Sequence, residues 1–155
     1  MAVIANSTQY AQQTTINKTG LSSGVNTLYF EGVTPTADVG TINFVKLPPG
    51  RLRILTQQSG FLCANMVATA NICIGTSAYT AANGIAVAAA PAVLKAVGLV
   101  NACVLANAPT LFANVANAGL LLDSLDGVTI YGTVNQANTV VNATFSGWVT
   151  YSYLG

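Results

Sequence analysis

Few side chains in this sequence could do chemistry, and they lie far apart along the chain. The 155 residues include five basic residues, four acidic residues and no histidine. Residues 20–24 (GLSSG) match the G-x-S-x-G pattern around a nucleophilic serine, which requires a strand before the serine, a helix after it and a base that takes its proton. The match lies in a Gly/Ser-rich stretch of a chain without histidine. We therefore expect no hydrolase site there.

Asp123 and Asp126 are the only two carboxylates that lie close together in the sequence. They lack further oxygen ligands at the spacings of a calcium loop, and both would lie on one turn rather than on opposite sides of a glycosidic bond. An Asp-Gly pair before an alternating apolar run is typical of a turn. The sequence therefore predicts a turn here, no metal or other cofactor, and no enzymatic activity.

The three cysteines, Cys63, Cys73 and Cys103, show no C-x-x-C spacing and have no histidine with which to share a metal. We expect them to be small buried hydrophobic residues of a protein made in a reducing cytoplasm. The N-terminus lacks the basic segment of an export signal, and the longest apolar stretch, residues 85–100, is interrupted by a proline and a lysine. The sequence therefore predicts neither export nor a membrane-spanning helix.

Charged residues make up only 6% of the sequence, although about a quarter of an ordinary soluble protein is charged. Hydrophobic residues make up 52%, which excludes a solvated disordered chain. Arg51 and Arg53 are the only basic residues close together, and a net charge of +1 is too small to hold a phosphate backbone. Nucleic acid is therefore not expected as a partner. Because low net charge favours association, we expect a homo-oligomer.

Residues 1–25 form a polar segment without hydrophobic periodicity, which predicts an extended N-terminal arm ahead of a domain at residues 26–155. The segment is either a frayed terminus or an arm that docks on a neighbouring subunit and becomes ordered there. Four spaced apolar residues would be its docking points: Ile4, Tyr10, Ile16 and Leu21.

From residue 26 onward, alternation of apolar and polar residues predicts short β-strands joined by Gly and Pro turns. Short strands are expected at residues 27–30 and 71–75. Residues 84–122 are rich in alanine but interrupted by proline and glycine, and there we expect short strands and loops with room for one helical turn. The pattern as a whole predicts an all-β fold, either an antiparallel β-sandwich or a jelly roll.

Two pairs of predicted strands are adjacent in the sequence and are expected to form hairpins. Residues 41–47 and 51–57 flank Pro48-Pro49-Gly50, whose proline and glycine suit a tight turn. Residues 128–134 and 141–153 alternate most clearly of all, and they predict a closing hairpin at the C-terminus.

Three residues on the predicted strands are candidates for an interface. Arg51 and Arg53 alternate on one strand and face the same way, either as a solvated edge that blocks strand pairing or as contacts to oxygen atoms of a neighbouring subunit. Trp148, the only tryptophan, lies on the polar face of the last strand and is either an interface anchor or the cap of a second small cluster. The neighbouring Gly147 predicts a bulge or bend in that strand.

Residues 40–55 (GTINFVKLPPGRLRIL), residues 70–81 (ANICIGTSAYTA) and the last alternating strands resemble small virion proteins of tailed phages. In that family, a run of the type LP-x-G-x-R-I-L leads to an IGT strand and a closing hairpin. The resemblance covers residues 26–155 and implies a head decoration (cement) protein with a β-sandwich or jelly-roll fold. It further implies a protein, often trimeric, that is made in the host cytoplasm and binds the major capsid protein on the surface of the virion. No catalytic residue is carried over.

The alternative function is receptor or carbohydrate binding by a module of a phage fibre or spike. Exposed aromatic side chains would then lie over a sugar ring, and the candidates are Tyr79, Tyr131 and Trp148. Copy number separates the two functions, because a cement protein covers the head whereas a receptor-binding module is found at a vertex or tail.

Overall fold

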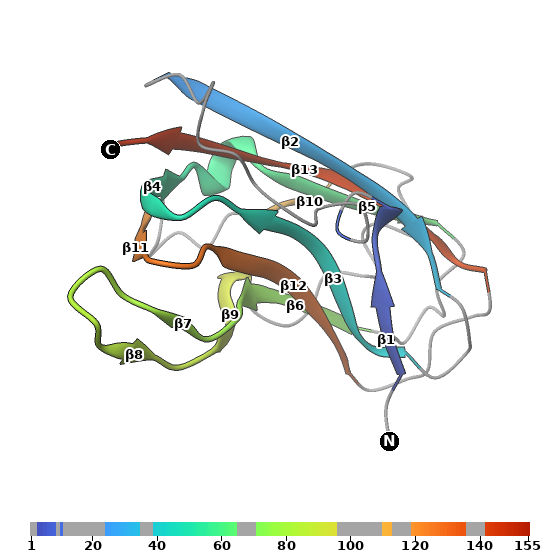
Figure 1. The fold of residues 1–155 in the computed structure, drawn as a ribbon. Coiled ribbons are helices and arrows are strands. Elements are labelled where there is room, and N and C mark those ends of the chain that lie inside the picture. The colour runs from blue at the N-terminus through green and yellow to red at the C-terminus, as the bar shows by residue number, and fades with distance from the viewer. Residues whose placement is uncertain are drawn as a thin grey trace.

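Two β-sheets packed face to face make up most of the described part of the chain (Figure 1). The structure is a computed structural model that describes the following residues: 3–8, 10, 24–34, 39–64, 71–95, 110–112, 119–135 and 142–155. Strands dominate these residues, so the predicted all-β sandwich is confirmed.

The first sheet, in the lower half of Figure 1, has five strands. Neighbouring strands are antiparallel, except that the first strand pairs in parallel with its neighbour. In spatial order the strands are β1 (Val3–Asn6), β3 (Val39–Leu47), β12 (Val128–Asn135), β6 (Asn71–Thr76) and β9 (Ala90–Lys95).

The second sheet is built around the long C-terminal strand β13 (Thr144–Tyr153). β2 (Val25–Val33) pairs with one edge of β13 along its whole length. On the other edge, β5 (Gly60–Ala64) and β4 (Gly50–Ile54) follow each other end to end, separated by the 3-10 turn η1 (Thr56–Gln58). Two short strands complete the sheet: β10 (Thr110–Leu111) beside β5, and β11 (Leu120–Ser124) beside β4.

The chain crosses between the two sheets at almost every connection, which is the strand order of a jelly roll. When β4 with β5 and β10 with β11 are each taken as one strand, only the connection from β6 to β9 stays within a sheet. That connection carries a small hairpin of β7 (Tyr79–Thr80) and β8 (Ala86–Val87).

The strands of both predicted hairpins are present, but the hairpins themselves are wrong. β3 and β4 lie in different sheets, so Pro48-Pro49-Gly50 connects one sheet to the other. The two prolines have no N–H with which to extend the ladder of β3, and Gly50 has a φ of 117°, which turns the chain away. β12 and β13 also lie in opposite sheets, and each pairs with strands of its own sheet. Alternation indicates which side of a strand is buried, but not in which sheet the strand lies.

Phenylalanine rings from both sheets meet at the centre of the core. The ring of Phe44 on β3 stacks on Phe30 of β2 with 4.6 Å between centroids. It also contacts Phe61 of β5 at 5.2 Å and Phe145 of β13 at 6.1 Å. Such aromatic pairs contribute about 0.5–1.5 kcal/mol each beyond their burial, so this cluster holds the sheets together.

Of the bulge or bend predicted at Gly147, the bulge is absent from β13. Its ladders with β2 and β5 continue past this residue with no register shift. A Cβ at this position would meet the carbonyl oxygen of Gly60 and would lie 2.5 Å from the ring of Phe30. Close packing against Phe30 therefore explains the glycine.

The first residues of the predicted arm belong to the sandwich of their own chain. Val3–Asn6 forms β1 on the edge of the first sheet, where Ala5 is buried in the core. The buried hydroxyl of Ser7 donates to the carbonyl oxygen of Phe44, and Asn43 Nδ2 donates to Asn6 Oδ1 at 2.9 Å. Residues 3–8 thus differ from the expected arm, whereas most of residues 9–23 lies outside the described residues and the boundary at residue 25 stays a prediction.

The described parts of residues 84–122 are strands and turns, as predicted. Residues 96–109 and 113–118 lie outside the described residues. No helix in the part of the chain that the structure describes has the length and apolar character needed to span a bilayer.

Candidate functional site

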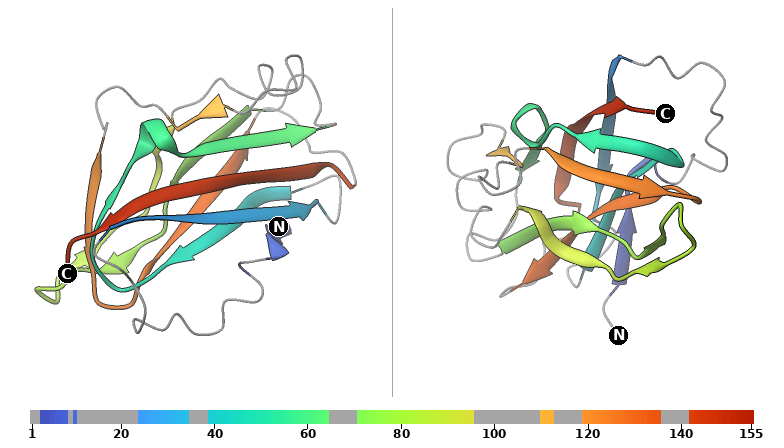
Figure 2. Two further views of the ribbon diagram at one scale, coloured as in Figure 1. Left: turned by 90° about the horizontal axis from the view of Figure 1, so that it is seen from above. Right: turned by 90° about the vertical axis from the view of Figure 1, so that its left-hand side faces the viewer.

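Alternation along β2 and β13 directs every second side chain out of the second sheet, away from the core. These side chains and their neighbours on the adjoining strands define the outer face, which turns toward the viewer in the left view of Figure 2. On β2 and β13 the outer face consists of Val25, Thr27, Tyr29, Glu31, Val33, Thr144, Ser146, Trp148, Thr150 and Ser152. On the adjoining strands it consists of Arg51, Arg53, Gly60, Leu62, Leu111, Leu121 and Asp123.

Large side chains of β2 are exposed on the outer face. Tyr29 is 70% exposed, and Val25 and Val33 on either side of it are 60% and 51% exposed. Among the described strands, β2 pairs only with β13 and so lies at the edge of its sheet. A valine side chain contributes about 1.5–3 kcal/mol when it is fully buried, so this row gains free energy if a partner covers it.

Trp148 lies next to Tyr29 across the β2–β13 ladder and is fixed in place. Its ring covers Gly60 on the other neighbouring strand, where an added Cβ would lie 2.7 Å from the indole. The indole Nε1 donates to the carbonyl oxygen of Gln58 at 2.7 Å. The side chain is therefore already ordered, and a partner that binds it loses little conformational entropy.

The turn that holds the indole is itself tied to β13. The backbone N–H of Thr150 donates to Ser59 Oγ at 2.9 Å, and Ser59 Oγ donates to the carbonyl oxygen of Leu55 at 2.9 Å. Thr150 Oγ1 donates to the carbonyl oxygen of Gln58, also at 2.9 Å. η1 thus interrupts β4 and β5 without loosening the sheet, and it places an acceptor under the tryptophan.

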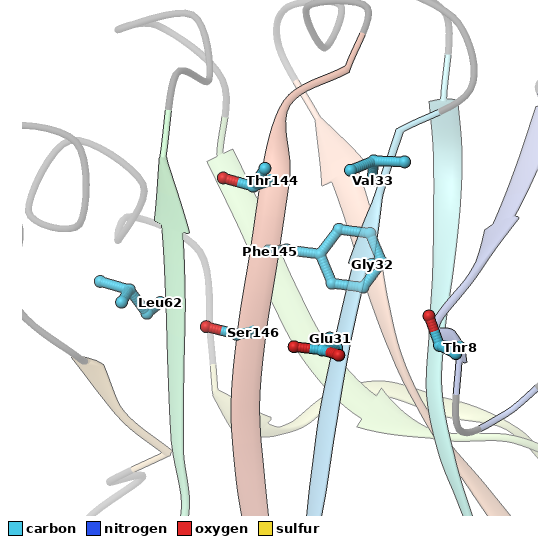
Figure 3. Close-up of a pocket in the computed structure, with 8 residues that line it drawn as sticks. All are labelled: Thr8, Glu31, Gly32, Val33, Leu62, Thr144, Phe145 and Ser146. Carbon is cyan, nitrogen blue, oxygen red and sulfur yellow. The ribbon is translucent and has the colours of Figure 1, made fainter.

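Three shallow hollows follow each other along the outer face. The largest, of about 460 Å³, is drawn in Figure 3, where Glu31 and Ser146 lie side by side between Leu62 and Thr8. The other two, of about 410 and 450 Å³, lie on either side of the Tyr29–Trp148 pair. The hollows have both apolar and hydroxyl-bearing walls, which suits an extended partner surface better than a small enclosed ligand.

Charges are few on the outer face and lie toward its ends. Arg51 and Arg53 are exposed and point outward together, as their alternation predicts, and their place in an interface stays a prediction. Arg51 pairs in register with Asp123, whereas the register neighbours of Arg53 are Leu121 and Ser152. Glu31 lies toward the other end, in register with Ser146.

The structure brings together only part of the predicted interface set. Arg51, Arg53 and Trp148 share the outer face, whereas Ile4 is 59% exposed on β1, at the edge of the first sheet. Tyr10 is half-buried, and its backbone N–H donates to Ser7 Oγ at 2.9 Å. The two remaining docking points lie outside the described residues: Ile16 and Leu21.

The three aromatic residues proposed for sugar binding do not form one site. Trp148 lies in the second sheet, whereas Tyr131 lies on β12 in the first sheet and Tyr79 on β7. Burial raises the pKa of the Tyr131 phenol, and burial together with the nearby Asp123 carboxylate raises the pKa of Tyr79. The three candidates therefore lie on different sheets, and a role of any one of them in sugar binding stays a prediction. The exposed aromatic neighbour of Trp148 is Tyr29.

The exposed outward row of β2 is not predicted by the sequence pattern. Residues 25–33 alternate between two sets that both contain apolar side chains, so the pattern predicts a strand without indicating its outer side. The signal in the sequence was that Tyr29 shares one side of the strand with the charged Glu31 and with Val25 and Val33. It becomes specific only when β13 places Trp148 beside Tyr29.

Chemistry at the described residues is limited. They hold no cluster of three or more potential metal ligands. Asp126 and Gly127 lie in the predicted turn between β11 and β12, where Gly127 has a φ of 83°, whereas Asp123 lies on β11 and not in the turn. Cys73 is buried as expected, while the side chains of Cys63 and Cys103 lie outside the described residues.

Comparison of the chain with protein-family models, curated proteins and solved structures finds no match in any of the three. The outer face therefore has to be interpreted from its own geometry.

Proposed function

We propose that the protein is a structural component of a phage virion, a decoration (cement) protein that binds the major capsid protein on the head and associates with its own copies. The single observation that carries this proposal is the outer face, which is broad, apolar along β2 and anchored by a fixed tryptophan. The resemblance to small phage virion proteins supplies the biological setting.

Sparse charge supports a structural rather than a catalytic role. A net charge of +1 and a charged fraction of 6% leave wide uncharged surfaces, which favour association with other subunits. Tyrosine and tryptophan are enriched at the energetic centres of interfaces, and Tyr29 and Trp148 lie side by side here.

A second apolar surface supports more than one kind of contact. Ile85, between β7 and β8, is 62% exposed, and Leu125, between β11 and β12, is 52% exposed. The two loops are adjacent, because the N–H of Leu125 donates to the carbonyl oxygen of Thr80 at 2.9 Å. A decoration protein needs separate contacts for the capsid lattice and for its own copies, and this loop pair offers a surface besides the outer face.

The proposed action is stabilisation by mass action. A protein that binds the assembled lattice, and not the free capsid subunits, shifts the equilibrium toward the assembled head. The effect needs no catalysis and grows with the number of occupied sites.

Carbohydrate binding is the second candidate, and a specific observation favours it. Tyr29 and Trp148 form an adjacent aromatic pair, and the Glu31 carboxylate and the Ser146 hydroxyl lie in the next hollow. Aromatic rings flanked by hydroxyl and carboxylate groups suit the apolar and polar faces of a sugar ring.

Co-sedimentation with phage heads tests the proposal. Heads of the phage whose genome encodes this chain are prepared without the protein, mixed with purified protein, pelleted and imaged by electron microscopy. Regular density over the head surface and a saturable copy number support decoration. Density confined to a vertex or tail, or binding to a glycan array without binding to heads, contradicts decoration and favours the second candidate.

A further inference from the structure

Charges of opposite sign lie toward opposite ends of the outer face. Glu31 is in register with Ser146 of β13, and Arg53 is in register with Ser152 of the same strand. Six residues of extended chain separate these positions by about 20 Å. Arg51 lies opposite Asp123, so this second pair adds no net charge to the face.

This arrangement is complementary to itself under a two-fold rotation. Glu31 on β2 and Arg53 on β4 lie on opposite sides of β13. When two such faces pack together about an axis that lies in the contact plane, passes near Trp148 and is perpendicular to the line from Glu31 to Arg53, each end of one face meets the other end of its partner. The acidic end then lies over the basic end, twice in each pair. In a two-fold contact both copies use the same surface, so that surface must be complementary to itself in shape and charge.

We propose that the outer face binds the outer face of a second copy of this chain, with Glu31 of each copy against Arg53 of the other. The exposed row of β2 and the fixed Trp148 form the apolar centre of this contact, and the charges set its orientation. Face-to-face packing of two sheets is a standard arrangement of β-structure.

The face is large enough for a stable dimer. At a strand spacing of about 4.8 Å and a rise of about 3.3 Å per residue, four strands along the length of β13 give a flat footprint of about 600 Å². Side chains that rise from this plane increase its accessible area, and a standard interface buries about 800 Å² on each partner.

This inference deepens the self-association part of the proposed function and is tested without any capsid. If the pair forms, the outer face is occupied, and other surfaces must make the contacts to the capsid, such as the loops with Ile85 and Leu125. A trimer would form through a three-fold contact at another surface, which is independent of the pair. Pairing of outer faces would then join two such trimers. Failure of the pair therefore leaves head binding open, and failure of head binding leaves the pair open.

Sedimentation velocity with charge-reversal variants is the test. The wild-type chain is expected to sediment at twice its 15.8 kDa mass at micromolar concentration, or at an even multiple of it. Glu31→Arg and Arg53→Glu, each alone, place like charges together in both halves of the contact and should weaken the pair about tenfold or more. An equimolar mixture of the two variants restores both attractive contacts, so the paired mass should return.

The mixture also controls for folding, because a variant that had lost its structure would not be rescued by its partner. Asp126→Arg, an exposed change of the same charge in the β11–β12 turn, is the matched control and should keep the paired mass. A monomeric wild-type chain, or an assembly whose mass is unaffected by both reversals, would overturn the proposal. So would two variants that each dissociate but fail to recombine when mixed.

Discussion

Ser124 and Ser59 are both buried serines, but only one of them has its hydroxyl satisfied. Ser124 Oγ finds no hydrogen-bond partner among the described residues, whereas Ser59 Oγ accepts from Thr150 N and donates to Leu55. Removing an unsatisfied hydroxyl costs nothing in hydrogen bonding, whereas removing a satisfied one leaves a buried N–H without a partner. Ser124→Ala should therefore leave the free energy of unfolding unchanged or raise it, and Ser59→Ala should lower it by about 1–3 kcal/mol.

Urea denaturation of the two variants beside the wild type measures both changes with the same substitution chemistry. A larger loss for Ser124→Ala than for Ser59→Ala would contradict the hydrogen-bond assignment around η1.

Tyr151 is a core residue whose ionisation affects the stability of the protein at alkaline pH. Burial raises the pKa of its phenol above the ordinary value of 10.0. Between that value and the raised pKa, the unfolded chain has released a proton that the folded chain still holds, so the free energy of unfolding falls as the pH rises. The stabilising contribution is complete below pH 10 and is lost above it.

Tyr151→Phe should therefore lose less stability than the wild type between neutral pH and about pH 11. Urea midpoints recorded across this range measure the difference. Parallel curves for the two proteins would show that Tyr151 makes no contribution to the alkaline loss.

At the scale of elements, the sequence was sufficient to predict the strands but not their connectivity. The alternation over residues 141–153 correctly assigns Phe145 and Val149 to the core and Trp148 to the opposite side. The same alternation occurs whether a strand pairs with its sequence neighbour or crosses to the other sheet. Crossing is decided by contacts between residues far apart in sequence, such as those of Phe44 with Phe30 and Phe145.

The candidate site also combines residues that the sequence predicts with residues that only the pairing of distant strands brings together. Arg51, Arg53 and Trp148 could be selected from composition and alternation, because rare charges and a single tryptophan on a polar face are visible in the sequence. Tyr29 could not be assigned to the site, because only the pairing of β2 with β13 places it beside Trp148. Ile4 was selected for its spacing, yet it lies on a strand of the other sheet.

β1 is the element whose position differs most from the sequence prediction. Ala5 and Ser7 are buried against β3, so a chain that begins after residue 8 should keep its β-fold but unfold at a lower urea concentration. The loss of the buried hydrogen bond from Ser7 to Phe44 alone should lower the free energy of unfolding by about 1–3 kcal/mol.

Circular dichroism and urea denaturation of the truncated protein test this contribution. Ile4→Ala changes an exposed side chain on the same strand and should alter stability by less than about 0.5 kcal/mol. An unchanged urea midpoint for the truncated chain would contradict the role of β1 as part of the sandwich.

For the molecule as a whole, the proposed function requires that other subunits cover one face. Low charge reduces repulsion between copies, the jelly-roll order places β2 and β13 side by side, and Trp148 lies at the centre of the resulting surface. Trp148 is also the only tryptophan of the chain, so its fluorescence reports on the outer face alone.

The most direct measurement is therefore acrylamide quenching of Trp148 fluorescence over a range of protein concentrations. If the outer face is an association surface, quenching is strong in dilute protein and falls as the concentration rises through the assembly transition seen by sedimentation. Glu31→Arg, which retains the tryptophan and its hydrogen bond to Gln58, should remain strongly quenched over the same range. Quenching of the wild type that is independent of concentration while the protein assembles would show that another surface is used, and would contradict the account.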